Sequence, residues 1–306
     1  MLQAQISSPS KRRRLPIGPP APEPLPLELK NAHPRDKRVV FHDTIEWEGK
    51  KWNHRYWIDG VTEGVKSCTA FTHFGFSEFD ADKQIAKMKT GSMLNPRSEY
   101  YGMTEQQVRA QWAQAGPLGT YMHRQIELYE NGLPYHGSGK EMQMFFNFKR
   151  DYPNLEIWRT EMNLFCKDLM VAGQADAIYR NENGEYEIYD WKRSKKIWPW
   201  GFCDCPWADG RKQHVEFEDG GRCEAFGSHE LTRNKQDCNK THYTIQLNLY
   251  RWLLKRFYGI EAVRLVLVVL HPNQDDYIRM ELPIWEDYVV SLMVERAKEL
   301  YPEKFQ

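Results

Sequence analysis

The sequence lacks an excess of charge of either sign. Lysines and arginines together number 42, aspartates and glutamates also number 42, and the formal net charge at pH 7 is zero. A nucleic-acid enzyme can be neutral overall when its basic residues gather on one surface. The charge balance therefore neither supports nor excludes a DNA substrate.

Long apolar runs are missing as well. No apolar secretory segment opens the chain, and no run approaches the ~20 residues that a helix needs to span a bilayer. We therefore expect a soluble, intracellular protein that does not bind membranes. Disulfides are rare in such a compartment, so the six cysteines are not expected to form them.

Hydrophobic periodicity is absent from residues 1–36, where prolines cluster between Pro16 and Pro26. This composition predicts a disordered tail. Within the tail, the basic block Lys11-Arg12-Arg13-Arg14 fits a nuclear import signal, which would imply a eukaryotic cell or a virus of one. A basic arm that adds non-specific phosphate affinity is the alternative.

Residues 37–306 are expected to form one domain, because 41% hydrophobic and 13% aromatic residues suffice for a sizeable core. Residues 39–57 predict two or three short strands, and a helical part follows over 80–88 and 104–115. The later elements expected are helices at 117–130, 141–152, 241–258 and 285–300, and strands at 156–166, 171–180, 185–192, 262–270 and 277–282. This order predicts a mixed central β-sheet flanked by helices, α/β in class.

The segment 171–192 contains two short runs with strand character, separated by the turn signal Asn181-Glu182-Asn183-Gly184. The length of the turn decides which side chains meet. A two-residue turn would put Asp176 and Asp190 on opposite faces of the hairpin. A three-residue loop with a left-handed Gly184 puts them opposite each other, and we expect this loop.

In this register Asn181 pairs with Glu185, and Gln174 lies opposite Lys192. Asp190 and Lys192 share a face because strand side chains alternate. Clustered carboxylates suit a hard cation such as Mg²⁺ or Mn²⁺, and a neighbouring lysine can orient or deprotonate a water molecule. An edge hairpin with solvated charges is the alternative.

Two helices carry further candidate residues. In the helix at 117–130, His123 and Glu127 share a face beside an apolar stripe, and a packed histidine is the alternative to a metal ligand. The stripe consists of Leu118, Met122, Ile126 and Tyr129. In the helix at 241–258, Gln246 and Tyr250 share a face, where they can equally be residues that cap the core.

Four motifs together resemble the PD-(D/E)XK nuclease superfamily, and more narrowly its RecB-like exonuclease branch. Gly173-Gln174-Ala175-Asp176 and Asp190-Trp191-Lys192 match its Gly-x-x-Asp and Asp-x-Lys core. The segment 119–123 matches its Gly-x-x-x-His motif, and 246–250 matches its Gln-x-x-x-Tyr motif. The resemblance covers 123–270 and implies a restriction-endonuclease-like α-β-β-β-α-β core.

The resemblance implies a Mg²⁺-dependent DNA nuclease, an exonuclease that acts on a free DNA end in repair, recombination or viral genome processing. It implies metal binding by His123, Asp176, Asp190 and a carbonyl near Trp191, with Lys192 positioning water. Site-edge or nucleic-acid contacts would come from Gln246, Tyr250, Gln174 and Ser194, and helpers would be Glu127 and Glu161. A non-catalytic nucleic-acid-binding module is the alternative.

The stretch 195–240 is expected as an insertion rich in cysteine, histidine and tryptophan. Its Cys203, Cys205, Cys223, Cys238, His214 and His229 could form a zinc site, as in a zinc-containing interaction protein, but their spacing is not that of a standard zinc knuckle. Free thiols in a lid-like loop are expected instead. No cysteine follows Tyr250, so the iron-sulfur cluster of some RecB-like nucleases is not expected.

The aromatic and basic residues of the insertion predict a loop that binds single-stranded DNA. These residues are Trp198, Trp200, Trp207, Phe217, Arg211, Lys212, Arg222 and Arg233.

Overall fold

The structure, a computed structural model, describes residues 30–47, 50–197, 207–208, 211–212 and 225–305. Its centre is a mixed six-stranded sheet in the order β10-β9-β6-β5-β3, with β4 paired to β5. The strands are β3 (Lys66–Ser67), β4 (Glu156–Cys166), β5 (Val171–Arg180), β6 (Tyr186–Lys192), β9 (Ala262–Val269) and β10 (Ile278–Leu282). The β6–β9 and β3–β5 pairs are parallel, and the others are antiparallel.

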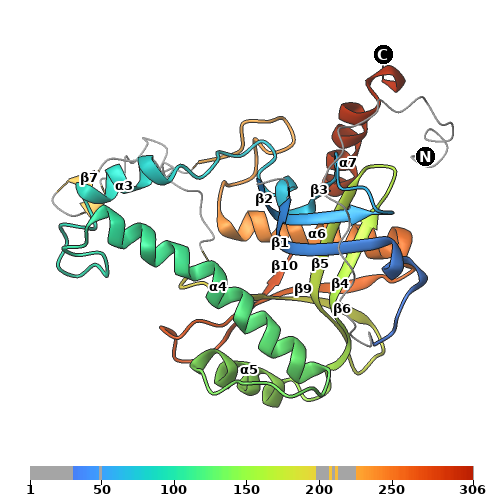
Figure 1. The fold of residues 1–306 in the computed structure, drawn as a ribbon, viewed down its shortest axis with the longest axis horizontal. Coiled ribbons are helices and arrows are strands. Elements are labelled where there is room, and N and C mark those ends of the chain that lie inside the picture. Colours follow the sequence, from blue (N-terminus) through green and yellow to red (C-terminus); the bar gives the residue numbers. More distant parts are fainter. Residues whose placement is uncertain (1–29, 48–49, 198–206, 209–210, 213–224, 306) are drawn as a thin grey trace.

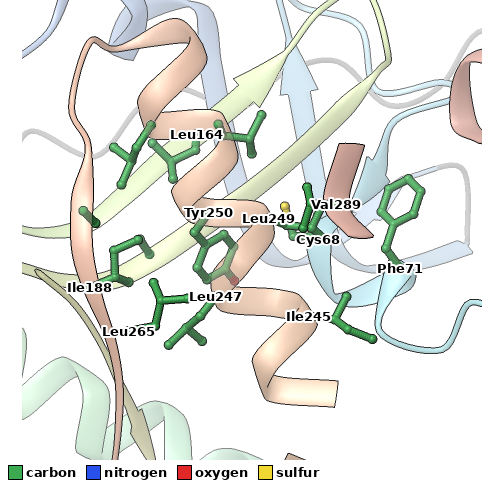
Figure 2. Close-up of a cluster of buried hydrophobic side chains, with 14 of the residues drawn as sticks. Cys68, Phe71, Leu164, Ile188, Ile245, Leu247, Leu249, Tyr250, Leu265 and Val289 are labelled. Atoms are coloured by element: carbon green, nitrogen blue, oxygen red, sulfur yellow. The ribbon is translucent and has the colours of Figure 1, made fainter. Parts of the chain in front are cut away.

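Helices cover both faces of this sheet (Figure 1). On one face, α4 (Glu105–Glu130) and α5 (Lys140–Asp151) pack on a cluster that includes Met122, Phe145 and Trp191. On the other face, α6 (Asn239–Phe257) and α7 (Glu286–Leu300) pack on a second cluster. Figure 2 shows that cluster around Tyr250 and Leu249 of α6. The expected α/β class, with a mixed sheet flanked by helices, is confirmed.

The turn between β5 and β6 is the expected three-residue loop. The N–H of Asn181 donates to the carbonyl of Glu185 at 3.0 Å, and the N–H of Gly184 donates to the carbonyl of Asn181 at 2.9 Å. Gly184 has a φ of 76°, the left-handed conformation that glycine adopts without steric cost. The ladder then runs to the pair Ala177–Tyr189 and ends there, before the expected pairs of Asp176 with Asp190 and of Gln174 with Lys192.

Helix α4 corrects two expectations. The sequence predicted two helices separated at Gly116-Pro117, but a single 26-residue helix runs through Pro117. Proline removes only one donor, and residues 113–118 are exposed, so water can satisfy the freed carbonyl. A capping box of Thr104 and Gln107 is present at its start. The apolar stripe is shorter than expected, because Leu118 is 44% exposed while Met122 and Ile126 are buried.

A two-stranded antiparallel ribbon precedes the sheet, formed by β1 (Val39–Trp47) and β2 (Lys50–Ile58). Away from the sheet, α3 (Ala81–Lys89) packs through Ile85 and Met88 on Val108 of α4. The remaining short elements are η1 (Pro34–Arg38), α2 (Cys68–Phe71), β7 (Trp207–Ala208), β8 (Arg211–Lys212) and η2 (Pro302–Lys304). Among the helices that the structure describes, none is long and apolar enough to cross a membrane.

Residues 30–36, expected to be the end of the tail, pack on the domain. The Arg35 guanidinium donates to the carbonyl of Phe165 at 2.7 Å and lies over the Phe165 ring at 4.0 Å. Asp36 forms a 2.7 Å ion pair with Arg159, whose side chain is 3% exposed. Residues 1–29, which include the basic block, lie outside the described residues.

Candidate metal centre

Three side chains from three different elements converge beside β5. His123 comes from α4, Glu161 from β4 and Asp176 from β5, and one ligand atom of each lies within 4.8 Å of the others. His123 Nδ1 is 3.5 Å from Asp176 Oδ2 and 3.9 Å from Glu161 Oε1. We call these three residues the His123 cluster.

The main chain of Trp191 orients the His123 ring. His123 Nε2 lies 2.8 Å from the carbonyl oxygen of Trp191, and because a carbonyl oxygen only accepts, Nε2 carries the ring proton. Burial, and then the Lys192 ammonium, lower the pKa of His123 to about 4. The ring is therefore neutral at pH 7, and Nδ1 turns a lone pair toward the two carboxylates. A backbone metal ligand was expected near Trp191, and the carbonyl of Trp191 itself accepts this hydrogen bond.

The N–H of Trp191 binds Asp176, donating to its Oδ2 at 2.9 Å. This contact lies where β6 has left β5. One edge of β5 is occupied by β4 over its whole length, so β6 and β3 share the other edge. β6 pairs with β5 from Ala177 onward and β3 pairs with Val171 and Ala172, so the Gly-x-x-Asp motif at 173–176 lies in the interval between them.

Glu161 lies in the middle of β4 with a left-handed φ of 45°. Its neighbours Thr160 and Met162 pair with Ala177 and Ala175, so Glu161 stands across from Asp176. Burial, and then the charge of Asp176, raise the pKa of Glu161 well above its ordinary value. The sequence suggested this residue only as a helper, whereas the structure makes it a full member of the His123 cluster.

Asp190 and Lys192 lie on one face of β6, as expected. Lys192 Nζ is 2.6 Å from Asp190 Oδ2 and 4.8 Å from the centre of the Tyr243 ring on α6. Asp190 is 1% exposed, and its Oδ1 has no hydrogen-bond partner among the described residues. The expected ligand Asp190 is therefore a buried carboxylate that remains under-satisfied, although its oxygens are not part of the His123 cluster.

Buried negative charge dominates the electrostatics of this region. Burial raises the pKa of Asp176 to about 6 against the opposing effects of Lys192 and the Trp191 N–H. Burial, and then the charge of Asp176, raise the pKa of Asp190 to about 6. For Lys192 burial acts to lower the pKa, but Asp190 and Asp176 outweigh it and raise the pKa. Two carboxylates separated from water thus compete for a single ammonium.

The donor set fits a divalent cation. A neutral imidazole whose lone pair faces two carboxylate groups has no proton to place between them, so the contact is favourable only when a cation stands there or when a carboxyl group carries a proton, as the raised pKa of Glu161 allows. Carboxylate oxygens are the ligands that Mg²⁺ and Mn²⁺ prefer, and imidazole is also a metal ligand. The His123 cluster is the only such group found among the described residues.

Gln246 and Tyr250 lie together on α6 behind β5 rather than at an open surface. Gln246 Nε2 donates to the Tyr250 hydroxyl at 2.8 Å and lies 3.4 Å from the Thr69 hydroxyl. Tyr250 is 3% exposed and belongs to the apolar cluster of Figure 2. A Cβ at Gly173 would come within 2.5 Å of the Tyr250 ring and 2.7 Å of Cys68 Sγ. Glycine is therefore required at Gly173 by the close approach of Tyr250.

Three other expected site residues lie outside the His123 cluster. Gln174 Nε2 is 3.4 Å from the main-chain carbonyl of Glu161, so it contacts the strand that carries Glu161. Ser194 Oγ donates to the carbonyl of Lys196 at 3.0 Å. Glu127 pairs with Arg124 at 2.6 Å within α4.

Most of the insertion's expected metal or DNA contacts lie outside the described residues or have no described side chain. These are Cys203, Cys205, Cys223, His214, Trp198, Trp200, Trp207, Phe217, Arg211, Lys212 and Arg222. Two described candidates for a zinc site make other contacts. Cys238 is a buried free thiol 3.3 Å from the Thr241 hydroxyl, and His229 Nδ1 accepts the N–H of Leu231 at 3.2 Å.

Two of the three comparisons with known proteins give no match. No protein-family model matches the chain, and no curated protein matches it either. A solved structure described as that of SSO0001 is similar over 79% of this chain and 78% of that chain, at 15% identity and a TM-score of 0.32. The chemistry of this chain is therefore argued from its own residues.

Proposed function

We propose that this chain is a metal-dependent DNA nuclease that uses Mg²⁺ or Mn²⁺. The observation that carries the proposal is the lone pair of His123 Nδ1, which faces the carboxylates of Asp176 and Glu161 beside the Asp190–Lys192 pair. A divalent cation, an activated water and a phosphodiester are the partners that such a set serves best.

The residues have separate tasks in this proposal. His123, Asp176 and Glu161 would hold the cation, and the buried Asp190 carboxylate on β6 would add negative charge to the site. Bound there, the cation would polarise a phosphoryl oxygen and offset the charge that develops on phosphorus and on the leaving oxygen. Lys192, paired with Asp190, positions the attacking water.

The order of elements supports the finer assignment of a restriction-endonuclease-like core. The helix that carries the histidine (α4) is followed by α5, then by β4, β5 and β6, and, after the short β7 and β8, by α6 with Gln246 and Tyr250 and by β9. Without α5, β7 and β8, this is the α-β-β-β-α-β order that the resemblance implies. We extend the proposal accordingly to an exonuclease of the RecB-like branch.

Digestion of end-labelled DNA tests the activity directly. The chain is incubated with linear and covalently closed circular DNA and with Mg²⁺, Mn²⁺ or EDTA. Metal-dependent release of mononucleotides from linear DNA, with circular DNA left intact, is the expected result for an exonuclease. Cleavage of both linear and circular DNA would indicate an endonuclease instead of an exonuclease. Binding without cleavage under every metal condition would instead favour the non-catalytic nucleic-acid-binding module.

A further inference from the structure

Among the described residues, two strands carry a left-handed residue other than glycine in their interior. One is Glu161 in β4, with a φ of 45°, and the other is His54 in β2, with a φ of 47°. The other described non-glycine residues with positive φ, Asn31, Asp59 and Met170, lie in turns. Strained backbone that the surrounding structure maintains within a strand is often found where side chains are aimed at a ligand.

The β1–β2 ribbon packs on the strands that carry the His123 cluster. Its inward face presents Val39, Tyr56 and Ile58 to Phe165 of β4 and Ala172 of β5. In Figure 1 the ribbon crosses the strands of the central sheet, and β1 contacts β4 while β2 contacts β5. The ribbon is therefore part of the surroundings of the cluster.

The inward face of the ribbon continues to Asp43 and His54. Phe41 pairs with Tyr56, and the next position on the same face is Asp43, opposite His54. On β1, Val39, Phe41 and Asp43 follow one another on this face because strand side chains alternate. Asp43 and His54 therefore extend the face of the ribbon that packs on β4 and β5.

The electrostatics agree with this placement. Burial dominates the raised pKa of Glu161, and the charge of Asp43 contributes to it after those of nearer carboxylates. Asp43 also acts on His123, where it opposes the burial that lowers the pKa. One carboxylate of the ribbon therefore acts on two members of the His123 cluster.

The His54 ring is held in place while one edge faces solvent. Its Nδ1 lies 3.3 Å from Asp43 Oδ1, and its ring stacks on Phe41 at 6.2 Å between centroids. The His54 side chain is nevertheless 75% exposed. A carboxylate that holds Nδ1 leaves Nε2 as the nitrogen available to a ligand.

We infer that His54, oriented by Asp43, contacts the phosphodiester backbone of the nucleic acid next to the His123 cluster. This inference rests on the proposed nuclease function, since it assigns a substrate contact to the same site. With Nδ1–H directed at Asp43, the imidazolium form of His54 would donate a hydrogen bond from Nε2–H to a phosphate oxygen, and Asp43 is a positioning residue that acts through His54. The ribbon thereby forms a wall of the site that none of the sequence motifs contains.

The matched variants are His54→Ala and His42→Gln. His42 is close to His54 on the ribbon but pairs with Arg55 and contacts the buried Trp57 ring, so it belongs to the other face. The readout is the Kd of a 5′-fluorescein single-stranded oligonucleotide with Mg²⁺, measured by anisotropy in an Asp190→Asn background that prevents cleavage. Losing a hydrogen bond to a charged group should raise the Kd on the order of tenfold in His54→Ala, and His42→Gln should not change it.

Three further measurements separate a substrate contact from other roles. The melting temperature and the calorimetric affinity for Mn²⁺ should stay unchanged in His54→Ala. In the cleaving background KM should rise while kcat stays within about twofold. Asp43→Ala should raise the Kd less than His54→Ala, and the double variant should be no worse than His54→Ala alone.

Each contrary outcome overturns the inference in a distinct way. An unchanged Kd in His54→Ala, or an equal change in His42→Gln, removes the contact. A loss of Mn²⁺ affinity would make His54 a metal ligand, and a lower melting temperature would make it structural. If the unmutated chain cleaves no DNA, the nuclease proposal fails, while the Kd comparison still decides the contact.

Discussion

Lys192 Nζ lies 2.6 Å from Asp190 Oδ2, and both side chains project from the same face of β6. Each residue changes the pKa of the other. Asp190 raises the pKa of the Lys192 ammonium, and Lys192 acts to lower the pKa of the buried Asp190 carboxyl group. Removing either residue therefore leaves the other uncompensated in a region with little water.

Asp190→Asn should remove cleavage while DNA binding stays measurable. The amide keeps the size of the side chain but removes the negative charge beside the proposed cation. Loss of this carboxylate should lower the rate by on the order of 10³ or more. Release of labelled nucleotides is the measurement, and Glu182→Gln, at an exposed carboxylate in the turn of the same hairpin, is the control. Wild-type rates in Asp190→Asn would falsify the assignment.

His123→Ala should weaken metal binding. Because Nδ1 turns a lone pair toward Asp176 and Glu161, its loss removes one ligand, and we expect the Kd for Mn²⁺ to rise at least about tenfold. The Mg²⁺ concentration at half-maximal activity should rise with it. Isothermal calorimetry is the measurement, with His136→Gln at an exposed position as control. An unchanged Mn²⁺ isotherm would return His123 to the role of a packed histidine.

Gly173→Ala and Gly119→Ala should change stability in opposite directions. A Cβ at Gly173 meets the Tyr250 ring at 2.5 Å, whereas a Cβ at Gly119 meets nothing within 4 Å. Overpacking at Gly173 should lower the free energy of unfolding by about 1–3 kcal/mol. Alanine in α4 should raise it by about 0.5–1 kcal/mol. Urea denaturation of both variants measures the difference, and equal effects would contradict the close approach of Tyr250.

Deletion of residues 1–29 should leave the fold intact, whereas Asp36→Ala should destabilise it. Asp36 is the partner of the buried Arg159 guanidinium and also accepts the N–H of His33. Leaving Arg159 charged and unpaired should cost about 3–5 kcal/mol. Thermal unfolding followed by circular dichroism compares the two. The contact is unimportant for stability if Asp36→Ala melts at the same temperature as the truncated chain.

Local signals in the sequence predicted most elements of the sheet and its helices. The Asn181–Gly184 turn set the register of the hairpin because its glycine permits a left-handed φ. The apolar run over 262–269 coincides with β9, and the capping box at Thr104 lies at the start of α4. Both signals are therefore local to the element that they indicate. The helix break expected at Pro117 was wrong because proline propensity is weak evidence where solvent can hydrate the freed carbonyl.

Contacts between distant segments could not be predicted in this way. Glu161 joins the His123 cluster only because β4 pairs with β5, and Arg35 packs on Phe165 across 130 residues of sequence. The ribbon position of Asp43 and His54 depends equally on tertiary packing. The pattern of residues within one segment carries no information about contacts with a distant segment. Asp176 could be indicated because its Gly-x-x-Asp motif lies within one strand.

The hydrogen bond from Trp191 to Asp176 gives one carboxylate two duties. The hydrogen bond links β5 and β6 beyond Ala177, where their ladder has ended. The same carboxylate lies closer to His123 Nδ1 than the Glu161 carboxylate does. A substitution of Asp176 would therefore remove a contact between the two strands together with a member of the proposed metal site.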